Sequence, residues 1–213
     1  MPLSLLFCHG WGFDAAFWDP LAALLPEFTQ ARDDVGYFGE ATSPLPSGHV
    51  LAITHSLGTM RLLAAPPPGL MGLVAVAGFD RFSAGDGFPG TPSRVVDRMV
   101  SAVAQEPETV LADFHALFGS DVPNGTPHVE RLQADLIVLR DGDRRDAAER
   151  LTVPILSLQA ERDPLLPVAV RETVFAAEGG VMRRTHPDAG HLLARDDPAW
   201  CAQAIRDFIA DLP

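Results

Sequence analysis

Ser56 is the first residue whose type and position suggest chemistry. It lies in the segment Thr54-His55-Ser56-Leu57-Gly58, after an apolar run at 50–53 that predicts a buried strand and before a helix-like segment at 59–65. A sharp strand-to-helix turn holds a serine hydroxyl clear of the sheet and directs the following amides toward it, as in the nucleophile elbow G-x-S-x-G. This chain keeps the serine and the second glycine but has Thr54 in place of the first. An ordinary turn with a capping serine is the alternative interpretation, so the other residues decide.

A base and an acid follow the serine in the expected order. A serine hydroxyl needs a base to take its proton, and the base needs a third group to orient it. Asp163 comes after a predicted strand at 155–159, and His191 comes after one at 181–185. The carboxyl ends of parallel strands lie at one edge of a sheet, where ligand crevices form. The sequence therefore predicts a catalytic triad of Ser56, His191 and Asp163.

Other titratable residues near these positions fit the triad less well. Asp188 and Asp196 adjoin the predicted base in the sequence instead of following a strand of their own, and His186 comes too early in its loop. The side chain of His55 is expected to point away from that of the serine. His9 is expected to form structural hydrogen bonds beside the oxyanion loop.

Acyl transfer also requires donors aimed at the developing oxyanion. The amide of Leu57 directly follows the serine, and the amide of Trp11 lies in His9-Gly10-Trp11-Gly12 at the end of the first predicted strand. An ordinary turn before a helix is the alternative for this second segment. Its place at the end of the first strand favours an oxyanion hole built by Trp11 and Leu57.

The elements that must position these residues alternate between strands and helices. Apolar runs predict buried strands, and such alternation predicts a mostly parallel sheet of about six strands. The expected strands lie at 3–8, 28–32, 50–53, 73–77, 155–159 and 181–185. Helical patterns follow near 14–25, 59–65, 168–177 and 198–212.

Residues 79–150 break this alternation. Helical stretches at 93–103, 107–118 and 127–139 succeed one another without a good strand between them. We therefore expect one α/β domain over residues 1–213, with a core at 1–78 and 151–213. The helical insertion at 79–150 would sit over the sheet, after the strand at 73–77.

Composition excludes several classes of function. The chain has 213 residues, 47% hydrophobic and 21% charged, with a net charge of −12 and only arginine as a basic residue. This balance argues against binding to nucleic acid and to anionic membranes. Cys8 and Cys201 are too few for a disulfide framework, and no signal peptide, membrane span or metal-ligand spacing is recognisable. We expect a cytoplasmic, monomeric protein without metal or organic cofactor.

At these residues the chain resembles the α/β-hydrolase superfamily and, within it, the pimeloyl-[acyl-carrier protein] methyl ester carboxylesterases of biotin synthesis. The shared motifs cover nearly the whole chain and are Leu6 to Gly12 with Phe17-Trp18, Ser56-Leu57-Gly58, Phe82-Ser83-Ala84 with Phe88-Pro89-Gly90, Phe114-His115-Ala116-Leu117, Asp143-Arg144-Arg145 and Asp163 to Pro167. The chain departs from the family in three respects. It starts directly at the strand that ends near His9, a Pro/Gly loop at 40–48 replaces a helix, and Thr54 and Thr59 stand at glycine positions.

The resemblance implies an α/β-hydrolase fold and a serine carboxylesterase acting on the methyl ester of an acyl chain, in particular a pimeloyl group on an acyl-carrier protein. It implies that the insertion is a lid with an apolar acyl slot, lined by Trp11, Phe114, His115, Leu117 and Phe118. It also implies that the carrier docks on lid arginines, here Arg94, Arg98 and Arg131, although acidic residues outnumber arginine across the insertion.

Other functions remain open at this point. A general short-chain esterase, a thioesterase or a carbon–carbon bond hydrolase would use the same scaffold. A binding protein of this fold with low turnover is a candidate of a different class.

Overall fold

A single parallel sheet forms the centre of the molecule. The computed structural model describes residues 2–176 and 180–212, and within them six strands pair in the order β2-β1-β3-β4-β5-β6, every neighbouring pair being parallel. The prediction of a mostly parallel sheet of about six strands is therefore confirmed. The strands are β1 (Leu3–Cys8), β2 (Thr29–Asp33), β3 (His49–His55), β4 (Leu70–Val76), β5 (Ile155–Ala160) and β6 (Val181–His186).

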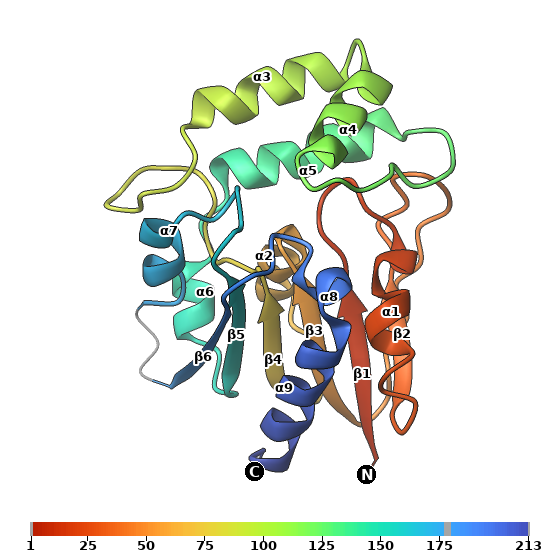
Figure 1. Ribbon diagram of the computed structural model, residues 1–213, viewed down its shortest axis with the longest axis vertical. Coiled ribbons are helices and arrows are strands. Elements are labelled where there is room, and N and C mark those ends of the chain that lie inside the picture. Colours follow the sequence, from red (N-terminus) through yellow and green to blue (C-terminus); the bar gives the residue numbers. More distant parts are fainter. Residues whose placement is uncertain (1, 177–179, 213) are drawn as a thin grey trace.

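Helices cover both faces of this sheet (Figure 1). Along β1, Leu5 and Phe7 belong to one buried cluster, and Leu6 and Cys8 belong to the other. Successive side chains of a strand point to opposite faces, so a continuous apolar run is what a strand covered on both faces requires. One layer contains η1 (Ala15–Trp18), α1 (Asp19–Ala22), α8 (Leu193–Asp196) and α9 (Pro198–Ala210), and the other contains α2 (Leu57–Ala64), α6 (Arg145–Glu149) and α7 (Val168–Thr173).

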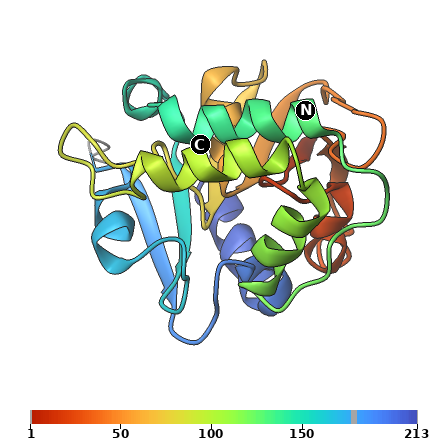
Figure 2. The ribbon, with the colours of Figure 1, turned by 90° about the horizontal axis from the view of Figure 1, so that it is seen from above.

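Three helices of the expected insertion, α3 (Ser93–Val103), α4 (Pro107–Ala116) and α5 (Val129–Asp141), lie across the carboxyl ends of the strands, as Figures 1 and 2 show from two directions. The last helix of the segment 79–150, α6, instead packs on the face of the sheet. Val96 and Val103 of α3 are buried in one cluster with Leu132 and Leu136 of α5. These helices therefore share a core with the layer of the sheet that contains α2.

The helices differ from the sequence prediction mainly in their ends. The expected helix at 14–25 is a 3₁₀ turn followed by a short helix, because Pro20 lies at its start and the chain turns toward β2. The short helices α6 and α8 were not predicted, since four or five residues carry too little periodicity. The helix expected at 168–177 ends at Thr173, and Ala177 is outside the described residues.

Within the described part of the chain, no helix has the length and apolar character to cross a membrane.

The turn from β3 into α2 is the most constrained backbone in the sheet. Ser56 has φ 52° and ψ −123°, a conformation that costs an L-residue about 1–3 kcal/mol. A Cβ on Gly58 would lie 2.4 Å from the Cys8 carbonyl oxygen and 2.7 Å from that of His9. Glycine at position 58 thus lets α2 begin directly against the end of β1.

The threonines at two glycine positions of the elbow contact each other. Thr54 and Thr59 are fully buried, and their hydroxyl oxygens lie 2.7 Å apart. The Thr54 hydroxyl also lies 3.3 Å from the Val74 carbonyl oxygen, to which it donates. Thr59 then donates to Thr54, so each hydroxyl satisfies a polar group that would otherwise be buried without a partner.

This pairing predicts coupled effects on stability. Replacing Thr54 with Val leaves the Thr59 hydroxyl buried without its acceptor, so we expect the free energy of unfolding to fall by about 1–3 kcal/mol. Thr54→Val/Thr59→Val removes both hydroxyls and should cost less than the sum of the two single changes. Urea unfolding of the four proteins measures this difference; strictly additive losses would contradict the pairing.

Candidate active site

The three residues of the predicted triad meet at the carboxyl ends of β3, β5 and β6. His191 Nε2 lies 3.1 Å from Ser56 Oγ, and His191 Nδ1 lies 2.7 Å from Asp163 Oδ2. All three side chains are buried. A carboxylate only accepts hydrogen bonds, so Nδ1 carries the proton and Nε2 is free to accept that of Ser56. This is the geometry in which a serine hydroxyl can be activated.

Asp163 is held as an ionised acceptor. Its Oδ1 accepts the amides of Leu165 and Leu166 at 2.8 and 3.1 Å, while Oδ2 faces His191. Burial raises the pKa of this carboxyl, but the charge and hydrogen bond of His191 and the two amides outweigh burial and lower the pKa below its usual value. The carboxylate can therefore stabilise a positively charged His191.

His55 supports the His191 loop, a role that the sequence did not reveal. Its Nε2 lies 3.1 Å from the His191 carbonyl oxygen, and its ring stacks on Phe17. Burial first, and then the neighbouring His191, lower the pKa of His55 well below its usual value. A neutral His55 donates from Nε2 to that carbonyl. The His55 ring thus holds the backbone of the loop that carries His191.

The other titratable residues of this region have partners of their own. Asp188 pairs with Arg162, His186 pairs with Asp197, and Asp196 accepts the amide of Gly190. None of these contacts involves the predicted triad.

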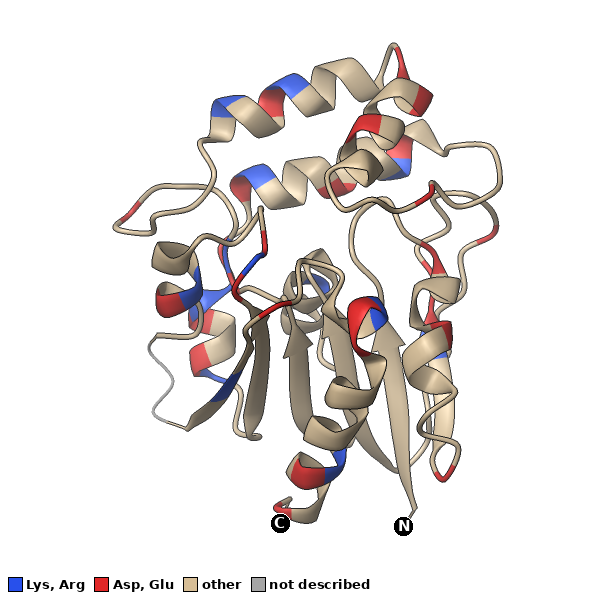
Figure 3. Cartoon of the chain, viewed as in Figure 1, with Lys and Arg blue, Asp and Glu red and all other residues tan. Residues whose placement is uncertain are grey.

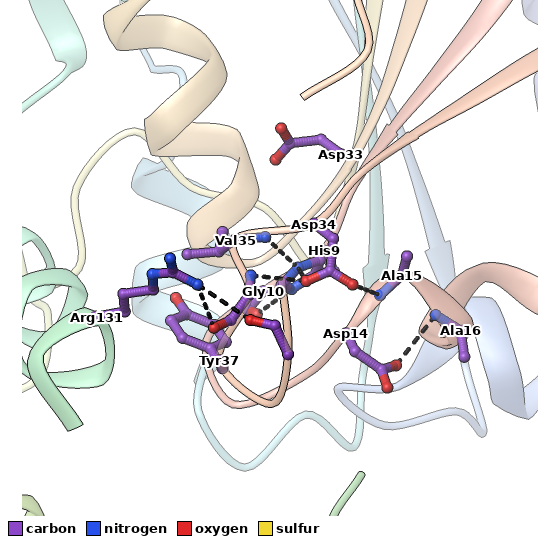
Figure 4. Close-up of polar contacts among 12 residues, drawn as sticks. His9, Gly10, Asp14, Ala15, Ala16, Asp33, Asp34, Val35, Tyr37 and Arg131 are labelled. Atoms are coloured by element: carbon purple, nitrogen blue, oxygen red, sulfur yellow. Dashed lines mark hydrogen bonds and ion pairs between the residues drawn. The ribbon is translucent and has the colours of Figure 1, made fainter. Parts of the chain in front are cut away.

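Figure 4 shows His9 and Gly10 in the turn that leads to Trp11, whose amide is the second predicted oxyanion donor. His9 Nδ1 donates to the Gly10 carbonyl oxygen at 2.8 Å, and its Nε2 accepts the Val35 amide at 3.2 Å. In a planar trans peptide the N–H points opposite to the C=O, so the bond to Gly10 turns the Trp11 N–H away from His9. A Cβ on Gly10 would lie 3.0 Å from Ser56 Cβ, which places this turn directly against the serine.

The amides of Trp11 and Leu57 are available to a ligand. Neither donates a hydrogen bond to an acceptor within residues 2–176 and 180–212. Leu57 is the first residue of α2, and the first amides of a helix have no acceptor within it. His9 directly follows β1, and Leu57 follows β3 and the serine. The two residues lie side by side because β1 and β3 are neighbours in the sheet.

A cavity of about 410 Å³ opens beside Ser56. Of the predicted substrate contacts, Trp11, Phe114 and Leu117 line it, whereas His115 and Phe118 are not among its lining residues in the described chain. Phe118 stacks on the His191 ring, with 5.3 Å between centroids. His115 is buried and bonds to the Gly12 carbonyl oxygen. The remaining walls come mostly from apolar side chains: Phe79, Phe82, Val95, Val96, Met99, Ala102, Val110, Leu136, Leu139 and Leu165.

The three arginines predicted to dock a carrier differ in their surroundings. Arg131 donates to the carbonyl oxygens of Gly36 and Gly39, and so fastens α5 to the loop after β2. Arg94 and Arg98 are exposed on α3 and have no ion-pair partner within the described residues. Arg98 also lines the cavity, together with Asp113 of α4. Within the same residues, no cluster of histidine, cysteine and acidic side chains is arranged to hold a metal ion.

The sheet, the elbow and the site geometry define an α/β-hydrolase fold, and solved structures agree. An esterase from Exiguobacterium antarcticum superposes with a TM-score of 0.83 at 17% identity, covering 99% of this chain and 92% of its own. An enol-lactonase from Burkholderia xenovorans superposes with a TM-score of 0.77 at 17% identity, again covering 99% and 92%. The predicted α/β-hydrolase fold is confirmed.

Curated relatives are more specific. The chain is 27% identical to the pimeloyl-[acyl-carrier protein] methyl ester esterase of Methylococcus capsulatus, over 97% of this chain and 94% of the relative. It is 28% identical to the enzyme of the same name from Serratia marcescens, with the same two coverages. A biotin biosynthesis bifunctional protein of Cellvibrio japonicus is 27% identical, and the match spans 98% of this chain but 48% of that longer protein. No protein-family model matches the chain.

The chain is thus similar to pimeloyl-[acyl-carrier protein] methyl ester esterases, as its sequence motifs predicted. The expectation of an enzyme of the carboxylic ester hydrolase class is confirmed at the level of that class.

Asp34 connects the loop after β2 to the start of η1, and this predicts a dependence of stability on acid. Its carboxylate accepts the amides of Ala15 and Gly36 at 2.9 and 2.8 Å. Burial raises the pKa of Asp34, but the hydrogen bonds at the carboxylate outweigh burial and lower the pKa to about 2. A lowered folded-state pKa stabilises the protein above the unfolded-state value of about 4, and this contribution is lost as the pH falls toward 2.

We therefore expect Asp34→Asn to reduce the free energy of unfolding at pH 7 by about 1–2 kcal/mol, a figure reduced for partial exposure of the carboxylate. The difference between variant and wild type should shrink as the pH falls from about 4 to 2. Denaturant unfolding at several pH values measures both proteins. A difference that stays constant with pH would contradict the ionised state of Asp34.

Proposed function

We propose that the protein is a serine carboxylesterase that hydrolyses the methyl ester of an acyl chain, with a pimeloyl group on an acyl-carrier protein as the substrate. One observation carries the proposal: His191 bridges Ser56 and Asp163 beside a largely apolar cavity of about 410 Å³. The names of the curated relatives support the choice of ester.

In the proposed mechanism, Ser56 Oγ attacks the ester carbonyl while His191 Nε2 takes its proton. Asp163 orients and stabilises the resulting imidazolium, and the amides of Trp11 and Leu57 donate to the oxyanion. His191 then returns the proton to the departing methoxide, so methanol leaves and an acyl-serine ester remains. A water molecule deprotonated by His191 attacks this ester, and the free carboxylic acid and Ser56 are regenerated.

We further propose that residues 79–150 act as a lid over a core of residues 1–78 and 151–213. The apolar walls contributed by α3, α4 and α5 would hold the acyl chain, with Trp11, Phe114 and Leu117 among its contacts. Exclusion of water by such walls strengthens the hydrogen bonds made to the oxyanion. A monomeric cytoplasmic enzyme that needs no cofactor remains our prediction.

The helices of the insertion that would face the carrier bear charges of both signs. Figure 3 shows acidic and basic residues side by side along α3, and acidic residues on α4. Arg94 and Arg98 are the arginines of α3 that are not paired within the described residues, whereas Asp97 lies between them and pairs with Arg140. An acidic carrier would therefore meet two arginines flanked by negative charge, so the affinity should depend strongly on salt.

The nucleophile can be tested by removing one oxygen. Ser56→Ala should reduce ester hydrolysis by several orders of magnitude and abolish labelling by a fluorophosphonate, because no other hydroxyl among the described residues is paired with His191. Ser101→Ala is the matched control, since this exposed hydroxyl bonds only within α3. Unchanged turnover by Ser56→Ala would refute the assignment of Ser56 as the nucleophile. If the wild-type protein were labelled but did not turn over esters, a binding protein would be favoured.

The substrate can be tested with three esters. Methyl pimeloyl–carrier protein should be hydrolysed with a kcat/KM at least about tenfold above that of the same acyl chain on a short pantetheine-like thiol, which corresponds to about 1.4 kcal/mol from the carrier. Arg94→Ala/Arg98→Ala should remove that advantage. Equal or better hydrolysis of p-nitrophenyl butyrate would favour a general esterase, and release of the thiol instead of methanol would favour a thioesterase.

A further inference from the structure

Four hydrogen bonds hold the His9–Gly12 turn: three are accepted by its carbonyl oxygens, and one is donated by the Trp11 side chain. Arg61 Nη2 donates to the His9 carbonyl oxygen at 3.1 Å, and His9 Nδ1 donates to that of Gly10 at 2.8 Å. His115 Nε2 lies 2.8 Å from the Gly12 carbonyl oxygen, and the Trp11 indole donates to the Leu132 carbonyl oxygen at 2.9 Å. The first two bonds come from the core, and the last two come from α4 and α5 of the insertion.

His115 is built to donate to this turn. Its side chain is 1% exposed, and its ring packs against Phe13 with 4.7 Å between centroids. A carbonyl oxygen only accepts, so Nε2 must carry a proton. Nδ1 lies 2.9 Å from Ser120 Oγ, which can supply the proton that the other ring nitrogen accepts. Both ring nitrogens are therefore occupied in the neutral Nε2–H form, and neither faces the cavity.

The bond to Gly12 fixes the peptide unit that joins Gly12 to Phe13, two units beyond the one that carries the Trp11 N–H. Gly12 has φ +73°, a conformation that glycine adopts without strain. A turn with such freedom keeps one conformation only where its carbonyls are held, and on the Gly12 side His115 is the side chain that holds it. On the other side His9 holds Gly10. The Trp11 N–H shares a peptide unit with the Gly10 carbonyl, and the Gly12 carbonyl follows two units later, so the turn is anchored at the Trp11 amide and again just beyond it.

Helix α5 is itself fastened to the core, so the insertion is a firm support for the turn. Asp135 accepts from the Tyr37 hydroxyl and from Arg61 Nη1, the latter at 3.3 Å. The same guanidinium contacts Asp33 at 3.3 Å and the His9 carbonyl. Arg61 thus joins α2, β2, α5 and the start of the turn through one partly buried guanidinium group.

We propose that His115 is a positioning residue for the oxyanion hole, which acts through the Gly12 carbonyl on the Trp11 amide. The insertion then contributes to stabilisation of the transition state in addition to covering the acyl chain. This inference rests on the proposed function, since it concerns the oxyanion of the same ester hydrolysis.

The test compares three variants on one simple ester, p-nitrophenyl butyrate. His115→Phe keeps a planar ring without a donor, and His115→Gln keeps an N–H donor near the position of Nε2. His128→Phe is the matched control, because this partly exposed histidine of the same insertion pairs with Glu130 and not with the turn.

We expect kcat of His115→Phe to fall about tenfold or more, because small displacements of a catalytic donor have large effects on rate, while KM changes less than twofold. His115→Gln should recover most of the loss, and His128→Phe should match wild type. The affinity for an aliphatic trifluoromethyl ketone, whose adduct with Ser56 places an oxyanion in the hole, should fall by the same factor as kcat/KM. Thermal unfolding shows whether each variant is folded at the assay temperature.

Two outcomes would overturn the inference: wild-type kcat and inhibitor affinity in folded His115→Phe, or a loss confined to KM. Failure of the proposed function has a different signature, since Ser56→Ala would then keep its turnover or wild type would show none.

Discussion

The site depends on the close approach of two backbones, the end of β1 and the start of α2. Gly58 permits this approach, because any side chain there would collide with the Cys8 and His9 carbonyl oxygens. The approach places the His9–Gly12 turn against Ser56, and it holds the serine in a conformation with φ 52° that an isolated chain would avoid. The strain is offset by burial of β1 and β3 between two helical layers, so the rigid sheet supports a reactive geometry at its edge.

Two sets of hydrogen bonds surround the contact between the end of β1 and the start of α2. One set runs from Asp163 through His191 to Ser56, and His55 holds the His191 backbone from beneath. The other set surrounds the turn and draws on the core and on the insertion alike. Because α4 and α5 bond to the turn, residues 79–150 are joined to the predicted oxyanion hole as well as to the cavity. Movement of these helices would therefore alter both at once.

The elbow shows how a pattern can change while its geometry is kept. Thr54 stands at the first glycine of the G-x-S-x-G pattern, and its hydroxyl accepts the proton of the Thr59 hydroxyl while it donates to the Val74 carbonyl oxygen. Thr59 without Thr54 would leave a hydroxyl unsatisfied in the core, which costs more than the net gain of one hydrogen bond. The two threonines are therefore one structural feature.

The sequence by itself determined the parallel sheet, its six strands and the order of the residues that meet at its edge. Apolar runs and their alternation with helices depend on the local spacing of apolar residues, and this spacing can be read directly from the sequence. Short elements such as α6 and α8 were missed because they carry too few residues for a period. The sequence also could not show that His115 bonds to Gly12, or that Arg61 joins α2 to Asp135. These contacts link residues about 100 and about 75 positions apart, and only the docking of the insertion on the core brings them together. Local pattern fixes which groups are present, whereas their partners are decided by tertiary packing.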